Sequence, residues 1–230
     1  MKVLFSLTIS FLLAVPVFGG QEDAKKSASL AACIEPAVMR TEAAQLLPGS
    51  KTTVVVPAWE DELGLSRLTK EEFTATGLKW EQFLTEASAT AAAHLKTLKP
   101  EIERDKKGAA RYAVLRSESH LTASVILCPE FFTKFRETFG DRLVVLVPDR
   151  FTVYVFPRGF NDFQEMGPDI LADFLESIWP CSDEAFEITS DGLKCLGAFD
   201  LMPAEPEKPA EPAAPKTAKE GSEKKNGEKK

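Results

Sequence analysis

The sequence is poor in the residue types that most often carry catalysis or bind metals. It contains only two histidines, His94 and His120, and its four cysteines include no CxxC pair. It also lacks a GxSxG nucleophile turn, a phosphate-binding glycine loop, a dinucleotide-binding glycine motif and a histidine-rich metal motif. These absences argue against the common zinc, nucleotide-dependent and α/β-hydrolase classes, and we expect no cofactor and no bound metal.

Positive charge is also scarce. The chain has 28 Lys and Arg against 35 Asp and Glu, for a formal net charge of −7. Residues 203–230 contribute seven lysines and six glutamates, which nearly cancel, so the net negative charge of the chain comes from the residues before them. Nucleic acids and anionic membranes select basic faces. We therefore expect no nucleic-acid partner, and an unidentified protein or envelope ligand instead.

The one long hydrophobic run lies at the start of the chain. Residues 3–18 are mostly apolar, follow a single lysine and precede Gly19-Gly20, which is typical of a secretory signal peptide over residues 1–20. The run is too short for a membrane span, so we expect no transmembrane segment after removal of the signal. The sequence thus predicts an exported protein, periplasmic or extracellular.

The other end of the chain has a different composition. Residues 203–230 contain five prolines and no aromatic residue. Such a segment cannot bury enough apolar surface to offset its ordering entropy, so we predict a disordered tail. Residues 21–202 lack an internal Gly/Ser linker and are predicted to form a single domain.

Export makes disulfides plausible for the four cysteines. Cys181 and Cys195 flank a predicted hairpin and are the best candidate pair. Pairing of Cys33 with Cys128 is suggested only because these two cysteines remain when the other two are paired. The alternative is that some of the four are small buried apolar residues.

The strongest structural signal lies at residues 142–156. Residues 143–147 form an unbroken apolar run rich in β-branched residues, and residues 151–156 mix aromatic and β-branched positions. The three residues between them, Pro148-Asp149-Arg150, predict a tight turn and a central antiparallel hairpin. Because the first run lacks polar alternation, we expect helices 77–98 and 168–178 to bury Val145 from both sides.

The remaining patterns complete an α+β fold with a mixed, largely antiparallel sheet and packed helices. Apolar periodicity predicts helices over residues 27–47, 77–98, 129–140 and 168–178, the last with Ile178 facing inward. It predicts strands over 51–57, 111–116, 185–189 and 193–199, and a strand or the start of a helix over 121–127. Residues 59–68 and 101–108 are predicted loops.

This order of elements resembles that of the YtpQ-like family of uncharacterised bacterial proteins, a domain of unknown function. The similar features are the Ala-rich helix over 86–95, the aliphatic segment leading to Pro-Glu over 124–130, the strand over 144–150 that closes on Pro-x-Arg, and Pro180-Cys181-Ser182 with Phe186. The resemblance covers residues 70–190. It implies an α+β fold and brings no established activity.

Two candidate sites remain. Ser119 and His120 lie in Ser117-Glu118-Ser119-His120, which offers a nucleophile, a base and a carboxylate, but neighbouring residues of an extended chain point to opposite faces. We expect His120 to be a turn residue that faces water. Asp149 and Arg150 could form a recognition point at the end of the hairpin, or they could cap the turn and pair with a nearby acid. The sequence favours a non-catalytic binding or envelope-associated domain, with a hydrolase using Ser119 and His120 as the alternative.

Overall fold

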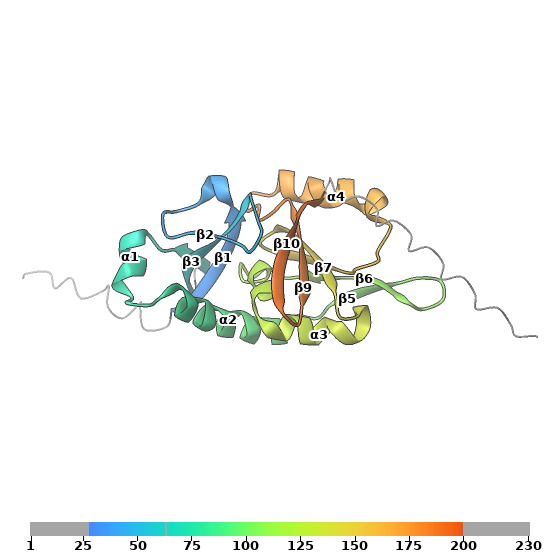
Figure 1. Ribbon diagram of the computed structural model, residues 1–230, viewed down its shortest axis with the longest axis horizontal. Coiled ribbons are helices and arrows are strands. Elements are labelled where there is room, and N and C mark those ends of the chain that lie inside the picture. Colours follow the sequence, from blue (N-terminus) through green and yellow to red (C-terminus); the bar gives the residue numbers. More distant parts are fainter. Residues whose placement is uncertain (1–27, 63, 200–230) are drawn as a thin grey trace, which may run out of the picture.

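The computed structural model describes residues 28–62 and 64–199, which form an α+β fold with two antiparallel sheets (Figure 1). This confirms the predicted fold class. The predicted signal peptide, residues 1–20, and the predicted tail, residues 203–230, lie outside the described residues.

The first sheet is built around β3, Thr53–Asp61. One edge of β3 pairs with β1, Ser29–Pro36, and the other pairs with β2, Gln45–Leu46, and β4, Gly64–Arg67. The helix predicted over residues 27–47 is therefore wrong, and so is the loop predicted over 59–68. The alanines of this region favour a helix, but the six central residues of β1 are all buried. Burial on both faces suits a covered strand and overrides helix propensity.

The second sheet has six strands in the order β10-β9-β7-β8-β6-β5. Its centre is β7, Leu143–Asp149, paired antiparallel with β8, Thr152–Pro157, which confirms the predicted hairpin. Asp149 pairs with Thr152, so the turn residues are Arg150 and Phe151.

Four further strands flank this hairpin. The predicted strands over 111–116, 185–189 and 193–199 correspond to β6, Ala110–Arg116, β9, Glu184–Thr189, and β10, Gly192–Ala198. The loop predicted over 101–108 is partly wrong, because β5, Glu101–Arg104, pairs with β6.

The two long predicted helices near the middle of the chain are confirmed. α2 spans Trp80–Thr97, and α3 spans Pro129–Phe139 and ends at Gly140, whose φ of 90° favours glycine. A short helix, α1, Lys70–Ala75, and the 3-10 turn η2, Ala37–Met39, were not expected. Residues Ala123–Leu127 form the 3-10 helix η3 and not a strand.

The last helix begins earlier than its proline indicates. α4 spans Phe163–Glu176 and contains Pro168 in its interior. Because it ends at Glu176, Ile178 lies beyond it and is 82% exposed, so the inward position predicted for Ile178 is wrong.

Helices cover both faces of the second sheet (Figure 1). Leu143, Val145 and Val147 share a core with residues of α2 and α3, whereas Val144 and Leu146 pack in a separate core with Ile170 of α4. Side chains of a strand alternate between the two faces. Val145 is thus buried on the α2 and α3 side only, which corrects the expectation that both helices cover this one side chain.

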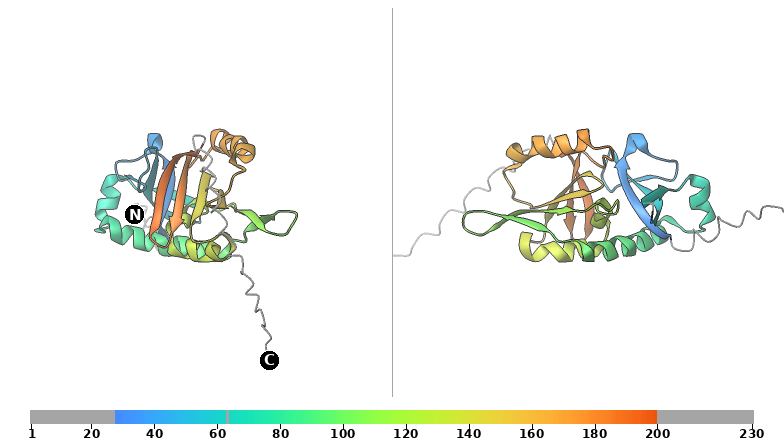
Figure 2. Two further views of the ribbon diagram at one scale, coloured as in Figure 1. Left: turned by 45° about the vertical axis from the view of Figure 1, so that its right-hand side comes forward. Right: turned by 180° about the vertical axis from the view of Figure 1, so that it is seen from behind.

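The two sheets lie side by side and are joined by apolar and polar contacts (Figure 2). Ile34 and Val55 of the first sheet belong to the same core as Val145 of the second. The buried carboxylate of Glu184 at the start of β9 accepts hydrogen bonds from Lys51 N at 2.9 Å and from Thr53 Oγ1 at 2.8 Å. The start of β3 and the residues before it thus supply partners for a buried polar group of the second sheet.

Candidate functional site: an acidic groove

The face of the second sheet that α4 covers extends beyond the helix. α4 packs on the central strand β7, and β8, β6 and β5 follow β7 in that order toward the edge of the sheet. Alternation along a strand places Tyr112, Val114 and Arg116 of β6 on one face. Strand pairing adds three more residues to that face. Glu101 and Glu103 of β5 lie opposite Val114 and Tyr112, and Tyr154 of β8 also lies opposite Val114. These six side chains form a floor beside α4.

One side of α4 forms the wall above this floor. Met166, Asp169, Ile170 and Asp173 follow the spacing i, i+3, i+4, i+7, which gathers side chains on a single helix face. Floor and wall enclose an open groove of about 610 Å³, lined by all these residues and Ile102. A groove of this size can hold a small ligand or a few side chains of a partner.

The polar groups of the groove are connected by hydrogen bonds from three elements. The Tyr154 hydroxyl donates to Asp173 Oδ2 at 2.9 Å and accepts from Arg116 Nη2 at 3.2 Å. Arg116 also pairs with Glu101 at 3.8 Å. Burial, together with the hydrogen bond to Asp173, raises the pKa of Tyr154 to about 12. Tyr154 therefore remains a protonated donor and not a base at neutral pH.

The charge of the groove is strongly one-sided. Four carboxylates line it, from Glu101, Glu103, Asp169 and Asp173, against the single cation of Arg116. Arg116 is already engaged by Tyr154 and Glu101. Two tyrosine rings also line the groove, and aromatic faces attract cations. The arrangement favours a ligand that carries positive charge.

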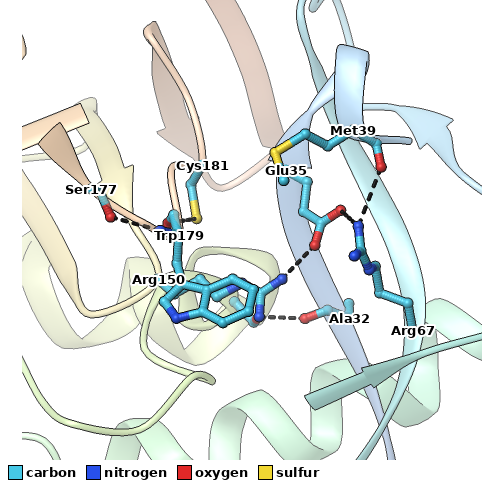
Figure 3. Close-up of polar contacts among 9 residues, drawn as sticks. Ala32, Glu35, Met39, Arg67, Arg150, Ser177, Trp179 and Cys181 are labelled. Atoms are coloured by element: carbon cyan, nitrogen blue, oxygen red, sulfur yellow. Dashed lines mark hydrogen bonds and ion pairs between the residues drawn. The ribbon is translucent and has the colours of Figure 1, made fainter. Parts of the chain in front are cut away.

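The predicted residues Asp149 and Arg150 lie elsewhere, at the junction of the two sheets. Asp149 Oδ1 accepts a hydrogen bond from Phe151 N at 2.8 Å, so this carboxylate stabilises the turn. Arg150 is only 4% exposed and forms a buried ion pair with Glu35 of β1, which also pairs with Arg67 at 3.2 Å. The Arg150 guanidinium lies 4.5 Å from the centre of the Trp179 ring (Figure 3). A recognition role for Asp149 and Arg150 stays a prediction, and the burial of Arg150 does not support it.

His120 lies beside this ion cluster. Its ring is half-buried, 5.0 Å from the Phe151 ring and 5.8 Å from the Trp179 ring. It also fills the space beside Gly64, where an added Cβ would lie 3.1 Å from His120 Cδ2. Burial, and then the charge of Arg150, lower the pKa of His120 below 6.5. The expectation that His120 simply faces water is wrong.

Ser119 is not positioned as a nucleophile for His120. Its hydroxyl oxygen accepts a hydrogen bond from Leu121 N at 3.2 Å, and within residues 28–62 and 64–199 no hydrogen bond joins it to His120. His94, the other histidine, contacts Thr122 Oγ1 at 3.2 Å through Nε2. The hydrolase hypothesis receives no support from this geometry.

All four cysteines are buried free thiols. Cys195 lies on β10, opposite Phe186 of β9, and Cys181 lies just before β9. Burial raises the pKa of Cys195 to about 11 and the pKa of Cys33 to about 12. A bond between Cys181 and Cys195, or between Cys33 and Cys128, stays a prediction.

The described part of the chain has neither a metal-binding cluster of side chains nor a helix suited to a membrane. Over residues 28–62 and 64–199, His, Cys, Asp and Glu side chains form no group of three or more suited to a metal ion. None of the helices in these ranges combines the length and apolar character needed to cross a membrane.

The groove residues were missed by sequence reasoning, although the pattern of those on β6 and α4 is visible in the sequence; Glu101 and Glu103 lie in a predicted loop. Tyr112, Val114 and Arg116 alternate along a predicted strand, and Asp169 and Asp173 are four residues apart on a predicted helix. Neither pattern says that the two elements meet. Glu35 was missed because its segment was predicted to be helical.

Compared with protein-family models, curated proteins and solved structures, the chain matches none of them. The resemblance to the YtpQ-like family therefore stays a prediction.

Proposed function

We propose that the protein is an exported, non-catalytic binding domain that takes a cationic ligand in the groove between α4 and strands β8, β6 and β5. The observation that carries the proposal is the excess of four carboxylates over one already paired arginine along a single groove. A protonated amine or a guanidinium group would gain charge attraction from these carboxylates and ring contacts from Tyr112 and Tyr154. Periplasmic or extracellular placement is proposed from the signal-like residues 1–20.

The chemistry of the groove supports binding more than turnover. Tyr154, the tyrosine of the floor that contacts Asp173, has a pKa raised to about 12 by burial and by its hydrogen bond to that carboxylate, so it stays protonated near neutral pH. Its lining includes no serine, cysteine or histidine that could serve as a nucleophile or as a base near neutral pH. Four carboxylates against one arginine leave the groove an excess of negative charge for a bound cation.

The proposal is tested by calorimetric titration with spermidine, a flexible triamine. Asp169→Asn and Asp173→Asn each remove one negative charge from the groove wall at nearly constant size. We expect each to weaken spermidine binding by about threefold to tenfold, and we expect added salt to weaken binding to the unmodified protein. Asp173→Asn keeps an oxygen that can accept from Tyr154.

Asp191→Asn is the matched control, because Asp191 is exposed at the β9–β10 turn, at the opposite end of the sheet from β5. Its affinity for spermidine should equal that of the unmodified protein. Equal affinity of all three variants would refute the groove as the binding site.

A further inference from the structure

The groove is continuous with an open sheet edge. β5 is the last strand of the six-stranded sheet, and β6 is its only strand partner among the described residues. The other end of the sheet is covered, because Cys195 N of β10 donates to Pro48 O at 2.8 Å. Unpaired backbone groups along an edge strand are a template for another strand.

The same short strand supplies both the edge and part of the groove. Glu101, Ile102 and Glu103 of β5 all line the groove. The β5–β6 hairpin projects from the body of the protein (Figures 1 and 2). Its turn is held by Asp105 Oδ1, which accepts from Lys107 N at 2.8 Å and from Ala109 N at 2.9 Å. These hydrogen bonds hold the turn that joins β5 to β6, and so help to keep β5 in place at the edge.

The charge of β5 selects what can pair with this edge. Glu101 and Glu103 are exposed and two residues apart, so they lie on the same face of the strand. A second copy of β5 laid along this edge would bring like charges together, which disfavours self-association. A strand with basic residues at alternate positions would instead place its charges beside these carboxylates.

We propose that the cation bound in the groove is presented by an extended basic polypeptide segment, which adds to β5 as a further strand. Alternate Lys or Arg side chains of this segment enter the groove toward Asp169 and Asp173, and the residues between them lie on the face of Ile102. Backbone hydrogen bonds to β5 supply affinity, and the groove supplies selection for positive charge. This inference rests on the proposed function and names the partner class of the same site.

The test compares a peptide of alternating Lys and Val with the same peptide N-methylated at alternate amides. Methylation removes backbone donors on one edge and leaves every charge in place. Calorimetry should show the unmethylated peptide binding at least about tenfold more tightly, and hydrogen exchange should show added protection of the outward-facing amides of β5, which β6 leaves unpaired, when it binds. A peptide of alternating Glu and Val should not bind.

The variant Glu101→Gln/Glu103→Gln should weaken binding of the Lys-Val peptide, whereas Glu137→Gln on the exposed face of α3 should not. If spermidine binds but the two Lys-Val peptides bind with equal affinity and add no protection to β5, the strand proposal is overturned and the groove proposal stands. Failure of both spermidine and the peptide would overturn the proposed function itself. Protection of the outward-facing amides of β5, which β6 leaves unpaired, before any peptide is added would show that this chain or a second copy already occupies the edge, and would also overturn the proposal.

Discussion

At the scale of single residues, the most consequential contact is the buried pair of Glu35 and Arg150. Glu35 is 1% exposed and comes from the first sheet, and Arg150 comes from the central turn of the second. The stacking of Arg150 on Trp179 and the second pairing of Glu35 with Arg67 leave this cluster closely packed. The pair is thus a buried polar contact that joins the two sheets.

Removing one partner of this pair should be costly. Glu35→Gln leaves the Arg150 charge buried without a counterion, and we expect a loss of about 3–5 kcal/mol in the free energy of unfolding. Urea unfolding followed by circular dichroism measures this loss. Glu42→Gln breaks an exposed pair with Lys70 and should change the stability little. Similar stabilities for the two variants would contradict the structural role of Glu35.

His120 should contribute to stability through its ring contacts. His120→Ala removes packing against Phe151 and Trp179, and we expect a loss of about 1–2 kcal/mol. The exposed neighbour Glu118 provides the control, because Glu118→Ala removes no such contact. An unchanged thermal midpoint for His120→Ala would show that the ring contacts are dispensable.

The pKa shifts of the histidines predict how stability depends on pH. Burial lowers the pKa of both His94 and His120 below their ordinary value of 6.5. Between the folded pKa and 6.5, the unfolded chain binds more protons than the folded one, so stability falls as the pH falls through this window. Urea unfolding at a series of pH values should show this slope, and His94→Gln/His120→Gln should flatten it. A free energy of unfolding that rises as the pH is lowered from 6.5 would contradict this prediction.

At the scale of elements, the central hairpin is the feature that the sequence predicts best. The apolar runs over 143–147 and 151–156 are unbroken, so strand assignment needs no knowledge of the rest of the chain. α2 is similarly clear, because its apolar residues keep one helical stripe for five turns. β1 could not be predicted in this way, because its alanines have high helix propensity and only the packing of α2 and β3 makes a strand more favourable.

The importance of the hairpin can be tested at Val145, which is fully buried against the α2 and α3 side. Val145→Asp places an unpaired charge in an apolar core, and we expect a loss of more than about 4 kcal/mol in the free energy of unfolding. The identical change at Val38, which is 91% exposed, is the control and should be tolerated. Thermal melts of both variants decide the matter, and a folded Val145→Asp with a normal midpoint would refute the burial of this strand.

At the scale of the whole molecule, the groove is a product of assembly. Its carboxylates come from β5 and α4, and the nearest two of different elements, Glu103 and Asp169, are 66 residues apart in the sequence; its tyrosines come from β6 and β8. Local patterns predict β6, β8 and α4, but they assign β5 to a loop and do not state that α4 stops short of the sheet edge. For this reason the sequence indicates an acidic binding domain in general terms and leaves its site unplaced.

The measurement that tests the groove most directly is a nuclear magnetic resonance titration of the isotope-labelled protein with spermidine. If the cation binds as proposed, amide shifts should change over 101–103, 112–116 and 166–173 and remain constant at the β9–β10 turn. The changes should shrink in Asp169→Asn/Asp173→Asn and as salt is added. Shifts confined to other parts of the protein, or no shifts at all, would contradict the proposal that this groove binds a cationic ligand.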